Sequence, residues 1–220
     1  MSVKPKIMTV YGTRPEAIKV APVVSALQND DRFDSVVVST GQHREMLEQV
    51  NIRFGITPDH DMALMKPGQT LNELVARAIQ GLDPIIEEEK PDVIISQGDT
   101  STAMVAALAG FHKGVKVVHL EAGLRTGNIF SPFPEEANRK IIGQIASLHL
   151  APTNESRENL RRENFRSKDI VVTGNTVIDA LLAASEWDVK FEDLRLEELR
   201  NSDEKLVLVT THRRENLDAM

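Results

Sequence analysis

The chain has 220 residues, which is enough for one large domain, or for one domain and the start of another. It has no cysteine, which excludes disulfides and thiolate metal sites and fits a cytoplasmic location, and no stretch approaches the roughly 18 apolar residues of a membrane span. The formal net charge of -7 argues against non-specific nucleic-acid binding, which depends on basic surface, but it allows a local basic pocket.

Short apolar segments alternate along the chain with longer segments of helical periodicity. Residues 6–11 predict a buried strand that Gly12 stops, and Pro15 follows in the first turn of a predicted helix. Inside that helix, Pro22 should bend the axis or remove one backbone hydrogen bond. Further strands are predicted within 34–40, 92–97, 116–123, 149–164, 169–184 and 205–216, and further helices within 41–50, 69–90, 104–112, 134–146, 149–164 and 169–184.

This alternation predicts an α/β fold class, a parallel sheet covered by helices on both faces. Right-handed crossovers place the carboxyl ends of the strands at one edge, and open sheets of this class bind ligands at that edge. Polar and charged residues follow most of the predicted strands, so we expect reactive side chains to gather there. They lie in residues 12–14, 41–44, 98–100, 121–125, 173–176 and 212–214.

Two basic residues of the first predicted helix are candidates for binding an anion. Arg14 stands at the helix N-terminus, where free backbone N–H groups and the helix dipole favour negative charge, and its guanidinium suits a phosphate. Lys19 lies one turn further on and can face the same anion. The alternatives are an ion pair of Arg14 with Glu16 or with a surface carboxylate, and a solvated Lys19.

Carboxylates follow two of the predicted strands and open one of the predicted helices. Asp99 is a candidate for chemistry, although an Asx turn or a helix cap is the commoner role at such a position. Glu121 leaves the core directly after a strand, so it meets either a ligand or a partner, for which Arg125 is the obvious choice. Glu135 and Glu136 open a helix, where a glutamate pair ordinarily complements the dipole.

The histidines and glycines argue against several classes of cofactor. His212 follows a predicted strand, where a structural hydrogen bond is the commoner role, and His119 lies inside a strand and is expected in the core. The histidines show no metal-ligand spacing, so we expect no metal. The first loop lacks the Gly-x-Gly-x-x-Gly pattern, and neither a Walker loop nor a nucleophile elbow occurs, so we expect no nicotinamide cofactor.

Taken together, the loop motifs closely resemble one family, the non-hydrolysing UDP-N-acetylglucosamine 2-epimerases. In the family's order, the motifs are GTRPEAIK, QHREML, GDTSTA, HLEAGLRTG, SPFPEEANR, TGNTVIDA and THRREN. The resemblance implies one half of a two-domain GT-B-type fold, in which two Rossmann-like domains face each other across a cleft.

The same resemblance implies an isomerase that interconverts UDP-GlcNAc and UDP-ManNAc and needs no redox cofactor. Members of the family eliminate UDP across C1–C2 to give 2-acetamidoglucal and add it back with the opposite configuration at C2. They usually act as homodimers and supply ManNAc units for cell-envelope polysaccharides. We expect no nucleic-acid or membrane partner.

The resemblance also assigns the groups that carry this chemistry. Asp99, Glu121 and Glu135 match the acid and base carboxylates, and the choice of which one removes the C2 proton stays open. A diphosphate leaving group needs its charge stabilised. The side chains that match this role are Arg14, Lys19 and the catalytic His212.

Four further residues match positions that bind the substrate or a regulator in the family. Arg139 and Asn175 match positions for substrate binding. Gln42 and His43 match a regulatory site for UDP-GlcNAc in bacterial members, whereas Gly68 stands where some relatives have an Arg.

The resemblance predicts three parts of the chain. Residues 1–184 form the N-terminal Rossmann-like domain with the catalytic carboxylates, residues 185–204 form a linker, and residues 205–220 begin the C-terminal nucleotide-binding domain. Because most of the second domain is missing from this sequence, activity of the chain alone stays open. Three alternatives also stay open: a GT-B-type glycosyltransferase, a hydrolysing epimerase, and an isolated domain without catalysis.

Overall fold

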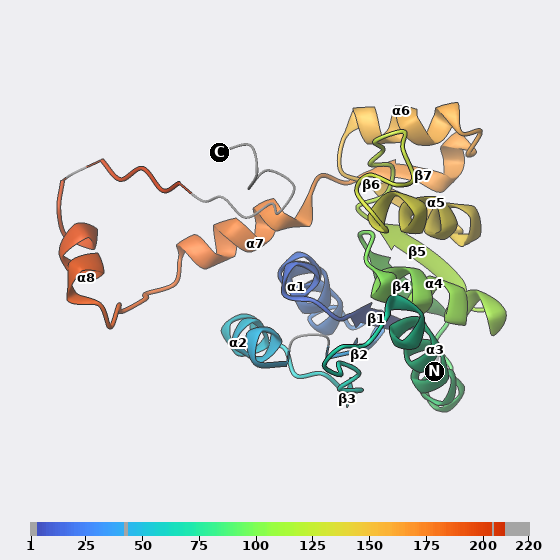
Figure 1. The fold of residues 1–220 in the computed structure, drawn as a ribbon, viewed down its shortest axis with the longest axis horizontal. Helices are drawn as coiled ribbons and strands as arrows, with labels where there is room; N and C mark the ends of the chain where they lie inside the picture. Colours follow the sequence, from blue (N-terminus) through green and yellow to red (C-terminus); the bar gives the residue numbers. More distant parts are fainter. Residues whose placement is uncertain (1–3, 42–43, 204, 210–220) are drawn as a thin grey trace. The chain divides into compact units, whose positions relative to one another are not determined.

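The computed structural model of the chain describes residues 4–41, 44–203 and 205–209 (Figure 1). The chain divides into two compact units, residues 1–183 and residues 184–220. The first unit holds a seven-stranded sheet and its covering helices. In the described part of the second unit, one helix forms, α8 (Leu194–Arg200).

All pairs of neighbouring strands in the sheet are parallel, in the order β3-β2-β1-β4-β5-β6-β7. The central strand β1 pairs with β2 from Lys6↔Asp34 to Tyr11↔Ser39. Both edge strands are very short, with two residues in β3 and three in β7. The strands are β1 (Lys6–Tyr11), β2 (Asp34–Ser39), β3 (His60–Asp61), β4 (Val93–Gln97), β5 (Lys116–Leu120), β6 (Leu148–Ala151) and β7 (Ile170–Val172).

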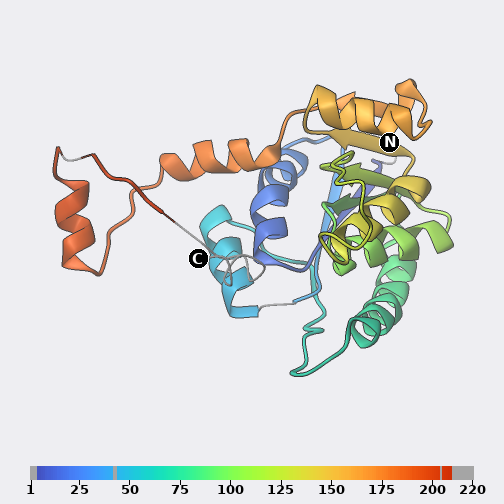
Figure 2. The same ribbon diagram turned by 45° about the horizontal axis from the view of Figure 1, so that its top comes forward.

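Helices cover both faces of the sheet (Figures 1 and 2). Helices α1 and α2 pack on one face, and α3, α4 and α5 pack on the other. The helices that begin in the first unit are α1 (Arg14–Gln28), α2 (Arg44–Phe54), α3 (Leu71–Glu89), α4 (Ser101–His112), α5 (Glu135–Ile145), α6 (Asn154–Arg162) and α7 (Thr176–Ser185), with one 3₁₀ turn at Ser167–Asp169.

Side chains of β1 alternate between two separate hydrophobic clusters. Ile7 and Tyr11 point to the cluster that includes Val20 of α1, while Met8 and Val10 point to the cluster of α3 and α4. Because the strand is buried on both faces, apolar residues point to both, and its one interior polar residue, Thr9, is itself fully buried. This confirms the α/β fold class and the reason given for it.

Most of the predicted elements are confirmed, and one prediction is wrong. The predicted strand at 6–11 is β1, and α1 runs on through Pro22 without ending there. The predicted strand at 205–216 is absent from its described part, since residues 205–209 have no regular structure. A strand needs backbone partners, and no described strand pairs with this segment, so Leu206 to Val209 remain 71–82% exposed.

The order of the strands places a switch point between β1 and β4. From β1 the chain moves outward to β2 and β3, then returns to the other side of β1 to form β4. At such a switch point the loops after the two neighbouring strands lead to helices on opposite faces of the sheet. In open α/β sheets ligands bind in the crevice at this point, at the carboxyl ends of the strands.

Two buried histidines lie side by side on neighbouring strands, His119 of β5 and His149 of β6. Each is 1% exposed, which confirms His119 as a core residue. The His119 Nε2 lies 2.8 Å from the carbonyl oxygen of Gly98, and His149 packs against Phe165. Burial lowers the pKa of His119 to about 4, and burial also lowers the pKa of His149.

We expect these histidines to make the protein less stable in mild acid. The unfolded chain binds a proton at each histidine near pH 6.5, whereas folded His119 stays neutral until about pH 4, so the free energy of unfolding falls as pH drops through that window. The expected loss from His119 is about 3 kcal/mol between pH 7 and pH 4. Urea unfolding at several pH values measures it. His119→Gln should reduce this pH dependence, and the exposed His112→Gln should not; equal slopes in both variants would contradict the assignment.

Candidate active site

The loop after β1 is closed by a capping box at the start of α1. The Thr13 hydroxyl accepts a hydrogen bond from the Glu16 N–H, and a Glu16 carboxylate oxygen accepts from the N–H groups of Gly12 and Thr13, at 2.9 and 2.7 Å. Pro15 has no N–H to offer. Fewer N–H groups than expected are therefore free for an anion here, because the loop's own carboxylate and hydroxyl bind those of Gly12, Thr13 and Glu16.

Glu16 also joins this loop to the loop after β4. It is 3% exposed, and its second oxygen accepts a hydrogen bond from the hydroxyl of Thr100, which itself caps α4. Burial raises the pKa of Glu16, and the hydrogen bonds from Thr100, Gly12 and Thr13 oppose that rise. One carboxylate thus connects the N-termini of α1 and α4 across the switch point.

We expect Thr100→Val to destabilise the fold more than the loss of a helix cap alone. The variant keeps the shape of the side chain but removes the acceptor for the Ala103 N–H and the donor to the buried Glu16, at a cost of about 2–4 kcal/mol in the free energy of unfolding. Chemical denaturation measures the change. Thr153→Val, which removes the α6 cap without touching a buried carboxylate, should cost only about 1 kcal/mol. An equal cost at both sites would refute the role given to Glu16.

Arg14 and Lys19 lie in different environments. Arg14 is exposed and forms no hydrogen bond or ion pair with any described residue, so the alternative of an ion pair with Glu16 is wrong. Lys19 is not a solvated lysine, because its Nζ lies 2.8 and 2.6 Å from the two carboxylate oxygens of Glu121. The helix therefore presents one unpaired cation and one paired cation at the crevice.

Glu121 sits where β5 ends, in a backbone conformation with φ of 67°, which is uncommon for a residue with a side chain. Its side chain is 11% exposed and accepts hydrogen bonds from Lys19, from Gln97 at 2.7 Å and from Asn175 at 3.3 Å. The expected partner, Arg125, is bound elsewhere. Backbone strain held in place by converging side chains is typical of a functional position.

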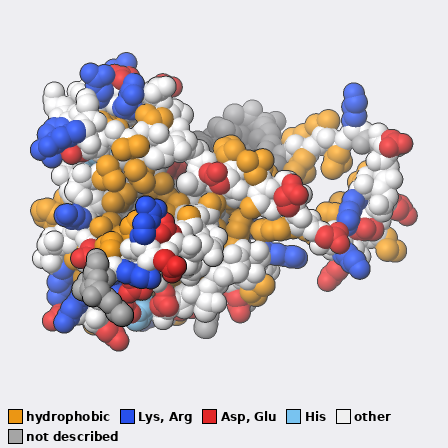
Figure 3. Space-filling view, turned by 180° about the vertical axis from the view of Figure 1, so that it is seen from behind, with side chains coloured by type: hydrophobic (Ala, Val, Ile, Leu, Met, Phe, Trp, Pro, Cys, Tyr) orange, Lys and Arg blue, Asp and Glu red, His pale blue; other side chains and the backbone are white. Residues whose placement is uncertain are grey.

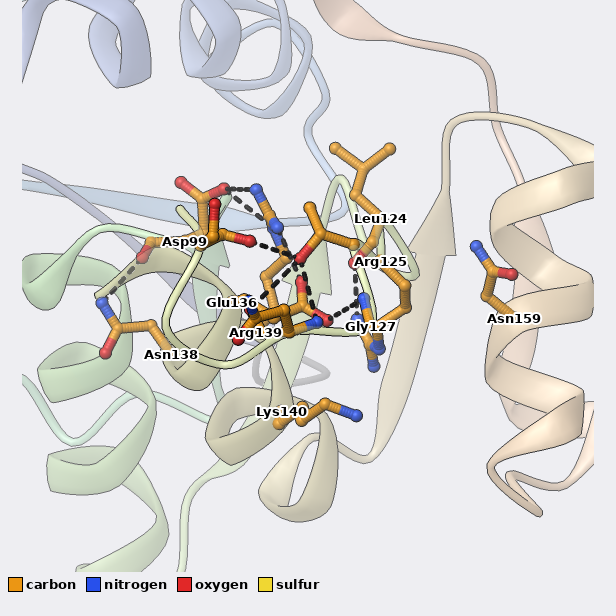
Figure 4. A network of polar contacts seen from close by, with 12 residues as sticks. Asp99, Leu124, Arg125, Gly127, Glu136, Asn138, Arg139, Lys140 and Asn159 are labelled. Atoms are coloured by element: carbon orange, nitrogen blue, oxygen red, sulfur yellow. Dashed lines mark hydrogen bonds and ion pairs between the residues drawn. The ribbon is translucent and has the colours of Figure 1, made fainter. Parts of the chain in front are cut away.

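Asp99 is held by an ion pair and not by a cap. Figure 4 shows its carboxylate facing the guanidinium of Arg139, whose Nε and Nη2 lie 2.9 and 2.6 Å from Asp99 Oδ2. The Asn138 amide donates to the Asp99 carbonyl at 2.8 Å. Thr100, the next residue, is the helix cap, so the commoner role considered for Asp99 is wrong.

The two glutamates that open α5 differ sharply. Glu136 is fully buried, at 0% exposure, and its carboxylate accepts from Arg139 at 2.8 Å and from the Gly127 N–H at 3.3 Å. Glu135 is half-buried, and its Oε2 is buried without a hydrogen-bond partner among the described residues. Of the pair, Glu135 is therefore the one with an oxygen available to a ligand.

The loop between β5 and α5 brings apolar side chains to the surface beside this polar network. Phe130 is 73% exposed, and Phe133 is 63% exposed. Figure 3 shows apolar patches lying among charged side chains on the face it presents.

Three predicted site residues lie outside the described residues: His212, Gln42 and His43. Within the described ranges, no three His, Asp or Glu side chains are grouped so as to hold a metal ion. In the same ranges, no helix has both the length and the apolar character needed to cross a membrane.

Sequence reasoning missed Glu16, Gln97 and Glu136 as parts of the site. The spacing of Thr13 and Glu16 is that of a capping box and would have identified the first of them. A glutamine that ends an otherwise apolar strand is a weaker signal for the second. Nothing in the sequence separates buried Glu136 from its half-buried neighbour Glu135, because that difference depends on the position of Arg139.

Comparisons with known proteins agree with the motifs. The sequence model of the family described as UDP-N-acetylglucosamine 2-epimerase matches residues 25–220. The UDP-N-acetylglucosamine 2-epimerase of Yersinia pestis is 52% identical over 216 residues, covering 96% of this chain and 57% of the relative. A crystal structure of UDP-GlcNAc 2-epimerase from Neisseria meningitidis, bound to UDP-GlcNAc, is 45% identical with a TM-score of 0.87, covering 96% of this chain and 58% of that one.

A more distant likeness concerns the fold alone. The apo form of a lipopolysaccharide outer core galactosyltransferase is 14% identical with a TM-score of 0.56, covering 77% of this chain and 45% of that one. The chain spans 57% of the length of the Yersinia pestis relative. With the motifs, the family match over residues 25–220 and identity of 52% to a curated relative, the chain belongs to the UDP-N-acetylglucosamine 2-epimerase family.

Proposed function

We propose that the protein to which this chain belongs is an isomerase that interconverts UDP-GlcNAc and UDP-ManNAc, and that the chain carries its acid and base carboxylates. The support comes from the family match and from the names of the relatives. The crystal structure of one relative contains bound UDP-GlcNAc. The proposal rests most on the geometry of Glu121. Its backbone is strained, and Lys19 binds its carboxylate at the edge of the sheet where the strands end.

The proposed chemistry is removal of the C2 proton, loss of UDP across C1–C2, and re-addition of UDP after a proton returns to the opposite face of C2. A carboxylate base and an acid are needed for the two proton transfers. Asp99, Glu121 and Glu135 are the proposed groups, and which one takes the C2 proton stays open. Asp99 lies in the loop after β4, Glu121 directly follows β5, and Glu135 is the first residue of α5. All three therefore stand at the same edge of the sheet.

Binding of the diphosphate is assigned to cations in this proposal. Arg14 has no partner among the described residues and stands exposed at the start of α1, so its guanidinium is free for an oxyanion. Lys19 and His212 are the other groups proposed for the diphosphate, and Asn175 is proposed for substrate binding. Arg139, which the resemblance assigns to substrate binding, has its nitrogens engaged by Asp99 and Glu136.

Proton exchange at C2 tests the proposal. The full-length protein is incubated with UDP-GlcNAc in deuterated water, and the sugar is followed by NMR. Deuterium at C2 together with UDP-ManNAc is the expected result. The same experiment with the 220-residue chain, with and without a separately supplied second domain, shows which parts are needed. No exchange in any mixture would overturn the proposal.

Product analysis separates the alternatives. A hydrolysing epimerase would release UDP and free ManNAc, and a glycosyltransferase would need an acceptor. The galactosyltransferase likeness concerns the fold alone, whereas the epimerase relatives are about 50% identical. An isolated domain without catalysis would bind the nucleotide sugar at most. None of these alternatives has an observation in its favour that the epimerase lacks.

The remaining parts of the proposal concern organisation. We propose that residues 1–184 are the catalytic N-terminal domain, residues 185–204 a linker and residues 205–220 the start of a nucleotide-binding domain. A homodimer in the cytoplasm that serves cell-envelope polysaccharide synthesis, with a regulatory site at Gln42 and His43, follows from the resemblance. The mass of the protein in solution tests the dimer, and a monomer at micromolar concentration would count against it.

A further inference from the structure

We propose that Arg139 is a positioning residue that acts through Asp99 and does not itself bind the substrate. The proposal rests on the proposed epimerase function for the meaning of its kinetic test, but its structural part stands without it. The observation behind it is a chain of polar contacts that runs from the buried Glu136 through Arg139 to Asp99 (Figure 4).

All three guanidinium nitrogens of Arg139 are engaged by the protein. Nε and Nη2 donate to Asp99 Oδ2 at 2.9 and 2.6 Å, and Nη1 donates to Glu136 at 2.8 Å. The residue is 9% exposed. Three of the five N–H groups are thus used within the protein and the side chain is buried, so Arg139 is far less open to a diphosphate than the exposed Arg14.

Glu136 anchors the arginine from inside the protein. It lies three residues before Arg139 on α5, so the two side chains meet on the same face of the helix. It is fully buried, and its other oxygen accepts from the Gly127 N–H at 3.3 Å. The buried charge is thus paired and hydrogen-bonded, which a buried carboxylate requires.

The contacts fix Asp99 through one oxygen of its carboxylate and through its backbone carbonyl. Arg139 binds only Oδ2, and no described residue hydrogen-bonds Oδ1. Asn138 holds the backbone by donating to the Asp99 carbonyl. His119 lies against the carbonyl of Gly98, the preceding residue. The carboxylate is therefore held in one orientation with one oxygen free to meet a substrate, which is the arrangement that proton transfer needs.

A double-mutant cycle separates the positioning role from direct substrate binding. In the full-length enzyme, Arg139→Gln should lower kcat at least about tenfold, with UDP affinity unchanged, because the effect is on the orientation of an acid or base. In an enzyme that already carries Asp99→Asn, Arg139→Gln should lower kcat little further, because the carboxylate that Arg139 positions is already gone. The kcat of Arg139→Lys should lie between that of the wild type and that of Arg139→Gln, because a single ammonium replaces the contact made by two guanidinium nitrogens.

A matched arginine controls for lost stability. Arg125 is similarly buried, with 8% of its side chain exposed, and it pairs with Glu163 at 2.7 Å. Arg125→Gln should reduce thermal stability as Arg139→Gln does but leave kcat unchanged. Effects of Arg139→Gln and Asp99→Asn that simply multiply, or a loss of UDP affinity in Arg139→Gln, would overturn the positioning role.

Amide hydrogen exchange gives a readout that does not depend on catalysis. Arg139→Gln should speed exchange in the segment around residues 98–100, and Arg125→Gln should not. If the wild-type enzyme shows no C2 exchange but this result holds, the proposed function fails and the positioning role stands. Unchanged amide exchange in Arg139→Gln would overturn the positioning role whatever the enzyme catalyses.

Discussion

Replacing Glu121 by Gln is expected to lower the rate of deuterium incorporation at C2 of UDP-GlcNAc by about 10³-fold, within the range known for a positioned acid or base. The amide cannot take or deliver a proton, yet it nearly preserves the size of the side chain. It can still accept a hydrogen bond from Lys19 or from Gln97, so the loop should keep its shape. Steady-state kinetics with the full-length enzyme measure the loss, and UDP binding measured by calorimetry should stay near that of the wild type.

Glu163 supplies the matched control for this prediction. It is also a carboxylate that accepts from two cations, Arg125 and Lys140, and the Arg125 hydrogen bonds hold its pKa at about 2. Glu163→Gln should leave kcat within a factor of about two at a temperature where both variants are folded. Similar rates for the two variants would remove Glu121 from the chemistry.

Replacing Gly123 by Ala is expected to destabilise the fold by about 3–6 kcal/mol, from a strained backbone and a steric clash together. Gly123 has φ of 90°, and a Cβ there would lie 2.2 Å from the carbonyl oxygen of Ser156 and 2.8 Å from its carbon. Both contacts are backbone atoms of α6, so no side-chain rotation relieves them. Calorimetry should show a melting temperature lower by roughly 6–20 °C.

Gly114 separates the two causes. Its φ of 73° is also left-handed, but a Cβ added there meets nothing within 4 Å. Gly114→Ala should therefore cost only about 1 kcal/mol, the strain without the clash. If the two variants melt alike, the close approach of the loop after β5 to α6 is not what requires a glycine at Gly123.

Most of the sheet, and the edge at which the candidate site residues gather, could be predicted from the sequence for a physical reason. Strands buried on both faces are rich in apolar residues, as in residues 6–11, and this strand ends where Gly12 begins a loop. Parallel pairing then gathers the loops at one edge, so that Asp99 and Glu121 could be placed there without any contact being known. The segment at 205–209 failed because an apolar run becomes a strand only when a neighbour supplies hydrogen-bond partners.

The pairing of charges could not be predicted, because it depends on side chains that are distant in sequence. Lys19 and Glu121 are 102 residues apart, and Arg139 and Asp99 are 40 apart. Sequence reasoning offered near neighbours instead, such as Glu16 for Arg14 and Arg125 for Glu121. In the folded protein those neighbours serve other partners, since helix geometry and burial, not proximity along the chain, decide which charges meet.

The short edge strands have a consequence for how the protein behaves at high concentration. An edge strand exposes unpaired backbone groups on which another polypeptide can build a fibrillar stack. With two residues in β3 and three in β7, the sheet offers little template at either side. The apolar run from Leu206 to Val209 is exposed and has no such protection. Precipitation of the isolated chain should therefore begin at that run, and charged substitutions there should suppress it while leaving the sheet intact.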